Sequence, residues 1–153
     1  MLPDHPTKEV YLIGEIDFSQ SLNESEIGSK NSRFSIKKVG PCKIEVYNGE
    51  GQIPHFHITG ISKKFNCCVR IYDAHFFSHG NKYRDTLNAS QCAELNNWLM
   101  QINSKSLPNA PVTNWQMIVY MWENSNPDCK YPEKLKTTSQ PDYSKMSLFR
   151  DEI

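Results

Sequence analysis

The hydrophobic pattern changes its period near residue 88, and this change sets the fold class. Before it, β-branched and aromatic residues form short runs that are separated by turn signals, at 9–18, 33–39, 42–47, 54–58 and 67–77. After it, apolar residues recur at three- and four-residue spacing over 88–103 and 113–124. Strands first and helices last predict an α+β domain, in which an antiparallel β-meander is followed by two α-helices packed on one face.

Local signals mark where these elements begin and turn. Asn48-Gly49 lies between two strand-like runs and predicts a tight type I′ turn, with positive φ at both residues. Each predicted helix opens with the residues of a capping box, Asn88 with Gln91 and Thr113 with Gln116.

The second predicted helix carries an apolar stripe, which is formed by Trp115, Ile118, Val119 and Trp122. Such spacing places these side chains on one face of the helix. We therefore expect Trp115, Ile118 and Trp122 to be buried against the sheet.

A chain of 153 residues provides enough material for one domain. From Ser125 onward the sequence is polar and contains Pro, Lys and Ser without a sustained period. We therefore interpret residues 1–124 as a single α+β domain and residues 125–153 as an extended C-terminal arm. Its few apolar residues are expected to dock singly on the body; they are Tyr131, Leu135, Tyr143 and Phe149.

Charge and composition argue against nucleic-acid binding, a membrane span and a disulfide framework. Seventeen basic and seventeen acidic residues cancel, so no overall field attracts nucleic acid, and a local patch of Lys37, Lys38 and Lys43 remains a weaker hypothesis. No run approaches the ~20 apolar residues of a membrane span, and the first residues lack the features of a signal peptide. Five cysteines without a CxxC pair predict reduced, buried thiols, and we expect a cytoplasmic protein.

The run "PHFHI" contains the main candidate site. On a strand, His55 and His57 share one face and Phe56 takes the other, so we expect the histidines to face outward or into a cleft. His75 and His79 also share a parity, and pairing of the two segments would gather four imidazoles in one patch. Imidazole is the commonest metal ligand in proteins, and such a cluster suits zinc, iron, nickel or copper.

Three interpretations of these histidines stay open: a metal site, a metal-free binding site and plain structural side chains. No carboxylate lies inside the pair, and the nearest in sequence are Glu50 and Asp73. We therefore expect hydrogen-bonded histidines without a metal or other cofactor. Arg70 and Tyr72 share a face with Cys68, which favours a surface for an anion or a peptide. A Cys68 nucleophile with a histidine base is the least favoured alternative, and no catalytic residue is assigned.

The segment from Cys42 to Pro127 resembles uncharacterised small bacterial and phage proteins with a Pro-His-Phe-His motif, in particular those of gut Bacteroidales and their phages. The resemblance rests on Pro54 to His57, Asn114-Trp115, Trp122 and Asn126-Pro127. It implies an α+β fold, and it favours a protein partner because short members look like parts of toxin–antitoxin-type gene pairs. This chain departs from them in its N-terminal strand region and its long C-terminal arm.

Together these features predict a small cytoplasmic protein-interaction module of bacterial or phage origin. Association with a virion is compatible with this interpretation. It contacts its partner through the histidine-bearing sheet face or the C-terminal arm. The alternative is a metal-dependent, hydrolase-like enzyme that uses His55 and His57 with His75 or His79.

Overall fold

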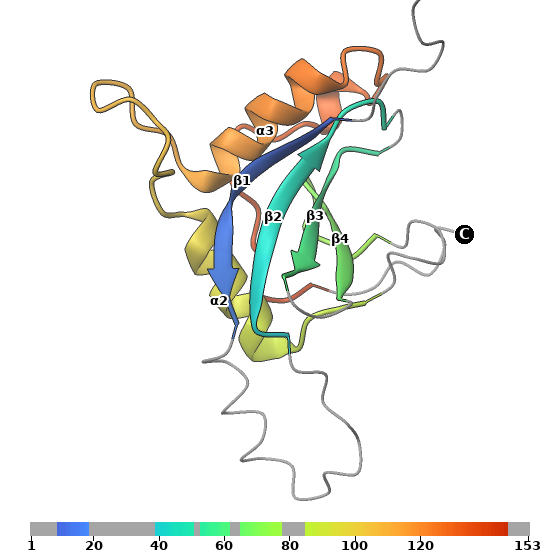
Figure 1. The fold of residues 1–153 in the computed structure, drawn as a ribbon. Helices are drawn as coiled ribbons and strands as arrows, with labels where there is room; N and C mark the ends of the chain where they lie inside the picture. The colour runs from blue at the N-terminus through green and yellow to red at the C-terminus, as the bar shows by residue number, and fades with distance from the viewer. Residues whose placement is uncertain (1–8, 19–38, 51–52, 62–64, 78–84, 147–153) are drawn as a thin grey trace, which may run out of the picture.

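The computed structural model describes residues 9–18, 39–50, 53–61, 65–77 and 85–146. Four antiparallel strands form one sheet in the order β1-β2-β3-β4 (Figure 1). The strands are β1 (Val10–Asp17), β2 (Pro41–Tyr47), β3 (His55–Gly60) and β4 (Asn66–Arg70). The predicted meander is confirmed, although the strand expected at 33–39 lies outside the described residues except for Val39 and is not tested.

The register of the sheet separates an apolar face from a face that bears histidine, glutamate and cysteine side chains. Ile58 of β3 pairs with Ile44 of β2 and Cys67 of β4, and all three side chains are fully buried in the hydrophobic core. The neighbouring residue on β3, His57, pairs with Glu45 and Cys68. Since successive side chains on a strand point to opposite faces, Cys67 and Cys68 point to opposite sides of the sheet.

Two helices, α2 (Ala89–Leu99) and α3 (Asn114–Ser125), lie behind the sheet on one face, as expected (Figure 1). Both predicted capping boxes form, with reciprocal side chain to backbone bonds between each N-cap residue and its glutamine. The helix predicted at 88–103 ends at Leu99, because the chain turns after Met100 and carries the buried Asn103 amide to the Ile13 carbonyl, 3.0 Å away.

The apolar stripe of α3 packs into the core, where Trp115, Ile118 and Trp122 are all buried. The arm adds a residue of its own to this core. Tyr143 is fully buried, accepts a 3.0 Å hydrogen bond from Trp115 Nε1, and packs edge-on against Phe56 of β3. These contacts of Tyr143 tie the arm to the body. The described part of the arm, residues 125–146, also contains the 3₁₀ helix η1 (Glu133–Leu135).

The predicted type I′ turn at Asn48-Gly49 is wrong. Gly49 has φ +66°, but Ala74 is the one non-glycine residue with positive φ in the described ranges. Asn48 instead extends the ladder between β1 and β2, because its backbone N–H donates to Glu9 and its side chain accepts from the Glu9 N–H at 2.6 Å. The connection then runs on to Pro54, and this longer path lets Glu50 fold inward, where it is buried.

The run at 67–77, for which the sequence predicts a strand or a bent strand pair, forms a bent pair. β4 ends at Arg70, and after a turn the chain returns so that Phe76 forms an antiparallel bridge with Val69. None of the helices in the described ranges is long and apolar enough to cross a membrane.

Candidate functional site

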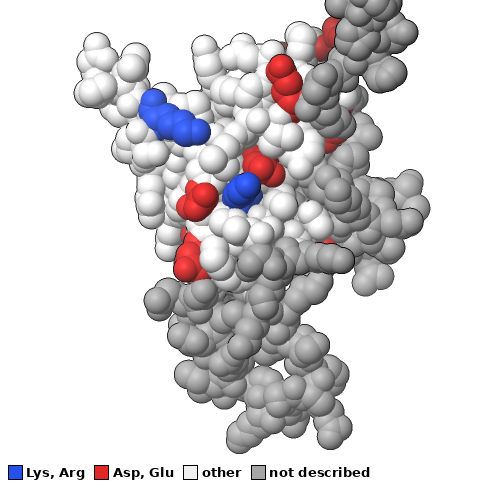
Figure 2. Space-filling view, viewed as in Figure 1, with Lys and Arg blue, Asp and Glu red and all other residues white. Residues whose placement is uncertain are grey.

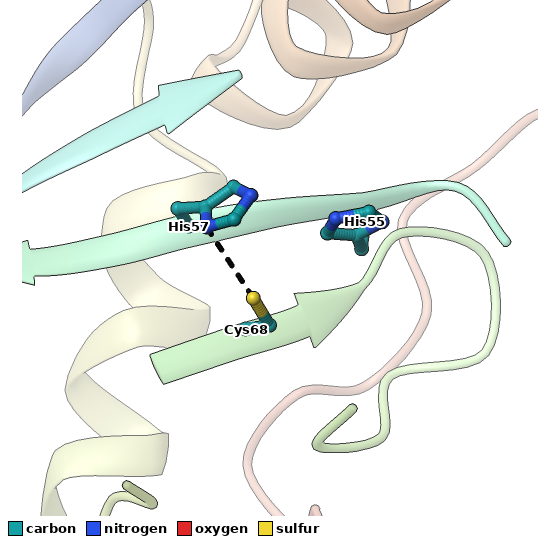
Figure 3. A group of neighbouring side chains, drawn as sticks. All are labelled: His55, His57 and Cys68. Carbon is teal, nitrogen blue, oxygen red and sulfur yellow. Dashed lines mark hydrogen bonds between the residues drawn. The ribbon is translucent and has the colours of Figure 1, made fainter. Parts of the chain in front are cut away.

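Neighbouring strands bring His55, His57 and Cys68 together. His57 on β3 pairs directly with Cys68 on β4, and their side chains face each other with 3.3 Å between Nδ1 and Sγ (Figure 3). His55 lies two residues earlier on β3, with its ring centroid 5.1 Å from that of His57. One ligand-type atom from each of the three residues lies within 4.8 Å of the others.

The two histidines are buried, which differs from the expectation that they face outward or into a cleft. His55 is 0% exposed and His57 is 1% exposed. The ring of Tyr47 stacks on His57 at 4.0 Å, while the rings of Phe77 and Trp122 lie 5.0 and 5.2 Å from that of His55. Aromatic groups from separate segments therefore cover a sheet surface that strand alternation alone would leave open.

Glu50 supplies the carboxylate that the sequence does not place near the pair. Its Oε1 lies 3.0 Å from His55 Nε2 and 3.3 Å from His57 Nε2, and its side chain is only 6% exposed. Asn126, which follows α3, fixes the loop because its Oδ1 accepts the Glu50 backbone N–H at 2.7 Å. Sequence reasoning missed this contact because it treated residues 48–52 as a tight turn.

The hydrogen-bond partners of His55, His57 and Cys68 indicate which of their atoms carry hydrogen. His55 Nδ1 lies 2.7 Å from the Ile53 carbonyl, which can only accept, so Nδ1 carries a hydrogen. Burial, with the Glu50 charge adding to it, raises the pKa of the Cys68 thiol far above its ordinary value. The protonated thiol donates to His57 Nδ1, and His57 Nε2–H then donates to Glu50 Oε1.

Cys68, His57 and Glu50 thus line up as thiol, imidazole and carboxylate, which are the residue types of a cysteine-hydrolase triad. The thiol is 1% exposed, and its raised pKa keeps it protonated, whereas a nucleophilic cysteine needs an accessible thiolate. The arrangement therefore does not fit nucleophilic attack on a substrate. The cluster as a whole, Glu50, His55, His57 and Cys68, is called the Glu-His-Cys cluster below.

Three other predicted site residues that the structure describes, Arg70, Tyr72 and His75, do not join this cluster. Arg70 is buried and forms a bidentate pair with Asp73, with contacts of 2.9 and 2.7 Å, while the Tyr72 hydroxyl donates to Glu123 at 3.0 Å. Both side chains are therefore engaged in contacts within the chain, and the suggested surface for an anion or a peptide stays a prediction. His75 donates from Nδ1 to the Asp73 carbonyl at 2.8 Å and is outside the ligand-type group, and His79 lies outside the described residues.

The most conspicuous surface feature is the connection between α2 and α3, residues 100–113, which is called the finger below (Figure 1). Antiparallel bridges join Ile102 to Thr113 and Leu107 to Ala110. The Asn103 side chain anchors its base to β1 through the Ile13 carbonyl, and Lys105 Nζ donates to the Leu12 carbonyl at 2.7 Å. The finger is therefore an ordered projection.

The finger exposes large apolar side chains around its base and tip. Ile102 is 57% exposed and Leu107 is 64% exposed; Met100, the first residue of the finger, is 52% exposed, and Leu12 of β1, whose carbonyl accepts from Lys105, is 39% exposed. These four residues are called the finger patch below. In Figure 2 the finger tip stands out at upper left as an uncharged knob, whereas acidic and basic side chains are interspersed over the rest of the visible described face.

Comparisons with known proteins add no family assignment. The chain matches no protein-family model, no curated protein and no solved structure.

Proposed function

We propose that the protein is an interaction module that binds a protein partner through the finger patch. The observation that carries the proposal is the exposure of Ile102 and Leu107 on a segment that is itself hydrogen-bonded and anchored to β1. An ordered loop loses little conformational entropy on binding. Most of the free energy gained by burying its apolar side chains therefore contributes to affinity.

The chemistry of the finger favours a protein over a nucleic acid. Lys105 is the sole charged residue between positions 100 and 113, and its amine already bonds the Leu12 carbonyl. Nucleic-acid binding depends on several Lys or Arg contacts to phosphates. The cores of protein interfaces are instead apolar and poor in charge, and a projecting finger fits a partner that offers an apolar groove.

The proposal replaces the histidine face with the finger as the contact surface, since the Glu-His-Cys cluster is buried. The same burial gives no support to a hydrolase that works through His55 and His57, because a substrate would have to reach both rings. All five cysteines are free thiols, and this supports the cytoplasm as the working compartment.

The test compares wild type with an Ile102→Ser/Leu107→Ser variant, using Leu135→Ser as the matched control. Leu135 is 50% exposed on η1, so its loss removes a comparable apolar group elsewhere on the surface. Proteins captured by wild type from a lysate of the encoding cells are identified, and the partner is purified and titrated calorimetrically against all three proteins.

We expect the double variant to weaken the dissociation constant by about 30-fold or more, which corresponds to loss of an interface hot spot, and Leu135→Ser to leave it nearly unchanged. Equal affinity for wild type and the double variant would refute the finger patch as the contact surface. A partner that proves to be nucleic acid would refute the proposal as well.

A further inference from the structure

The Glu-His-Cys cluster has the composition and spacing of a metal centre. We propose that it binds one divalent ion of the zinc class, with His55 Nε2, His57 Nδ1 and Cys68 Sγ as direct ligands and Glu50 as the carboxylate partner. This site is independent of the finger patch, so either proposal can fail without the other.

The distances between the candidate ligand atoms suit a shared ion. Ligands bound to tetrahedral zinc at the usual 2.0–2.3 Å lie about 3.3–3.6 Å from one another. Cys68 Sγ and His57 Nδ1 are 3.3 Å apart, which lies within this range. The three direct ligands already lie within 4.8 Å of one another, so small side-chain rotations bring them to bonding distance.

His55 is held in the form that a metal ligand requires. Its Nδ1–H donates to the Ile53 carbonyl at 2.7 Å, which leaves the Nε2 lone pair directed into the cluster. Glu50 Oε1 lies 3.0 Å from this Nε2, so a carboxylate stands beside the atom that would bind the ion. Metal-bound histidines commonly donate their second ring N–H to a carbonyl or a carboxylate, as His55 does here.

His57 is placed in the same way by its two neighbours. When Nδ1 binds the ion beside Cys68, Nε2–H donates to Glu50 Oε1 at the 3.3 Å contact. The Glu50 carboxylate then orients the ring and, being close to His55 Nε2, stands next to the fourth coordination position. The hydrogen bond from the Glu50 backbone N–H to Asn126 Oδ1 fixes the backbone that carries this carboxylate.

Donor chemistry and charge select the class of ion. Two imidazole nitrogens and one thiolate suit zinc and other borderline or soft ions, whereas Mg²⁺ and Ca²⁺ prefer all-oxygen sites. Binding of the ion displaces the Cys68 proton to solvent, and the divalent ion, the resulting thiolate and the Glu50 carboxylate then sum to zero charge. Neutrality matters because an unpaired charge in a site this buried is costly.

The experiment titrates the full chain with Zn²⁺ in competition with a chromophoric chelator, and with Co²⁺ for absorption spectroscopy. The variants are Cys68→Ala and Glu50→Gln, and Cys67→Ala is the matched control. Cys67 is the adjacent buried thiol, but it pairs with Ile58 on the apolar side of the sheet. Circular dichroism checks that each variant is folded.

We expect one equivalent of Zn²⁺, and a thiolate-to-Co²⁺ charge-transfer band that Cys67→Ala keeps and Cys68→Ala loses. Glu50→Gln should weaken Zn²⁺ binding by about 10- to 100-fold, which is typical for loss of a group that orients a ligand. If Cys68→Ala does not fold, the wild-type Co²⁺ spectrum still decides. A wild type that fails to compete with the chelator, or whose bound Co²⁺ lacks the thiolate band, would overturn the proposal.

Discussion

Tyr143 provides a quantitative test of whether the C-terminal arm belongs to the folded body. Its side chain is fully buried, although it lies 18 residues beyond the end of α3 at Ser125. Its hydroxyl accepts from Trp115 Nε1 and donates to the Ile71 carbonyl, and its backbone N–H donates to the Asn96 side chain at 2.9 Å. The arm therefore closes the core between α2, α3 and the end of β4.

Two substitutions separate the ring from the hydroxyl. Tyr143→Ala removes a buried aromatic ring and leaves a cavity, so it should lower the free energy of unfolding by about 3–5 kcal/mol. Tyr143→Phe keeps the ring, and Trp115 Nε1 keeps its second acceptor, the Ile71 carbonyl at 3.2 Å. The loss should then be only about 1 kcal/mol.

Urea unfolding followed by tryptophan fluorescence measures both values, because Trp115 is in direct contact with Tyr143. The transition midpoint should fall in the order wild type, Tyr143→Phe, Tyr143→Ala, with the slope m unchanged. Leu135→Ala, on the exposed η1, should change stability by less than about 0.5 kcal/mol. If Tyr143→Ala matched this control, the arm would not be part of the core.

Three further changes test the fold and its electrostatics. Gly14→Ala should cost about 1–3 kcal/mol in urea unfolding, because a Cβ there would lie 2.9 Å from the Trp98 ring; an unchanged midpoint would mean that α2 does not approach β1 so closely. Asn88→Ala removes the cap of α2 and should cost about 1 kcal/mol, whereas a loss within error would show that the capping box contributes nothing. Burial raises the pKa of Cys92 to about 11 and that of Cys42 to about 12, so their thiols ionise more readily in the unfolded chain. Stability should therefore be fully present below pH ~9 and decline as pH rises from there toward 11 or 12, with a shallower decline in Cys92→Ala; identical pH profiles of the two proteins would contradict this.

Local signals predicted the elements of the fold well. The periodicity of the apolar residues indicated both helices. Asn88 with Gln91 marked a helix start, because a capping box involves residues only three positions apart. The burial of Trp122 followed from its spacing with Ile118. These features depend on neighbouring residues, so a single sequence contains the information.

Long-range contacts were out of reach for the same reason. The sequence predicts that Tyr143 docks on the body but does not indicate where, because its core position depends on Trp115 and Phe56, which are far away in sequence. The placement of Glu50 depends on Asn126, so the sequence indicates the histidine pair but not the carboxylate that it contacts. Arg70 looked available for a ligand, yet the turn after β4 brings Asp73 back to pair with it.

The most direct test of the Glu-His-Cys cluster is a long-range ¹H–¹⁵N NMR spectrum of the imidazole rings in the metal-free protein. The account predicts a protonated Nδ1 on His55, a protonated Nε2 with a bare Nδ1 on His57, and slow exchange of both ring hydrogens with water. Cys68→Ala should shift the His57 Nδ1 resonance and leave His55 Nδ1 in place, because only His57 accepts from that thiol. The account would be contradicted if the ring hydrogens exchanged rapidly with water, the rings showed mixed tautomers, and the ring resonances did not change in Cys68→Ala.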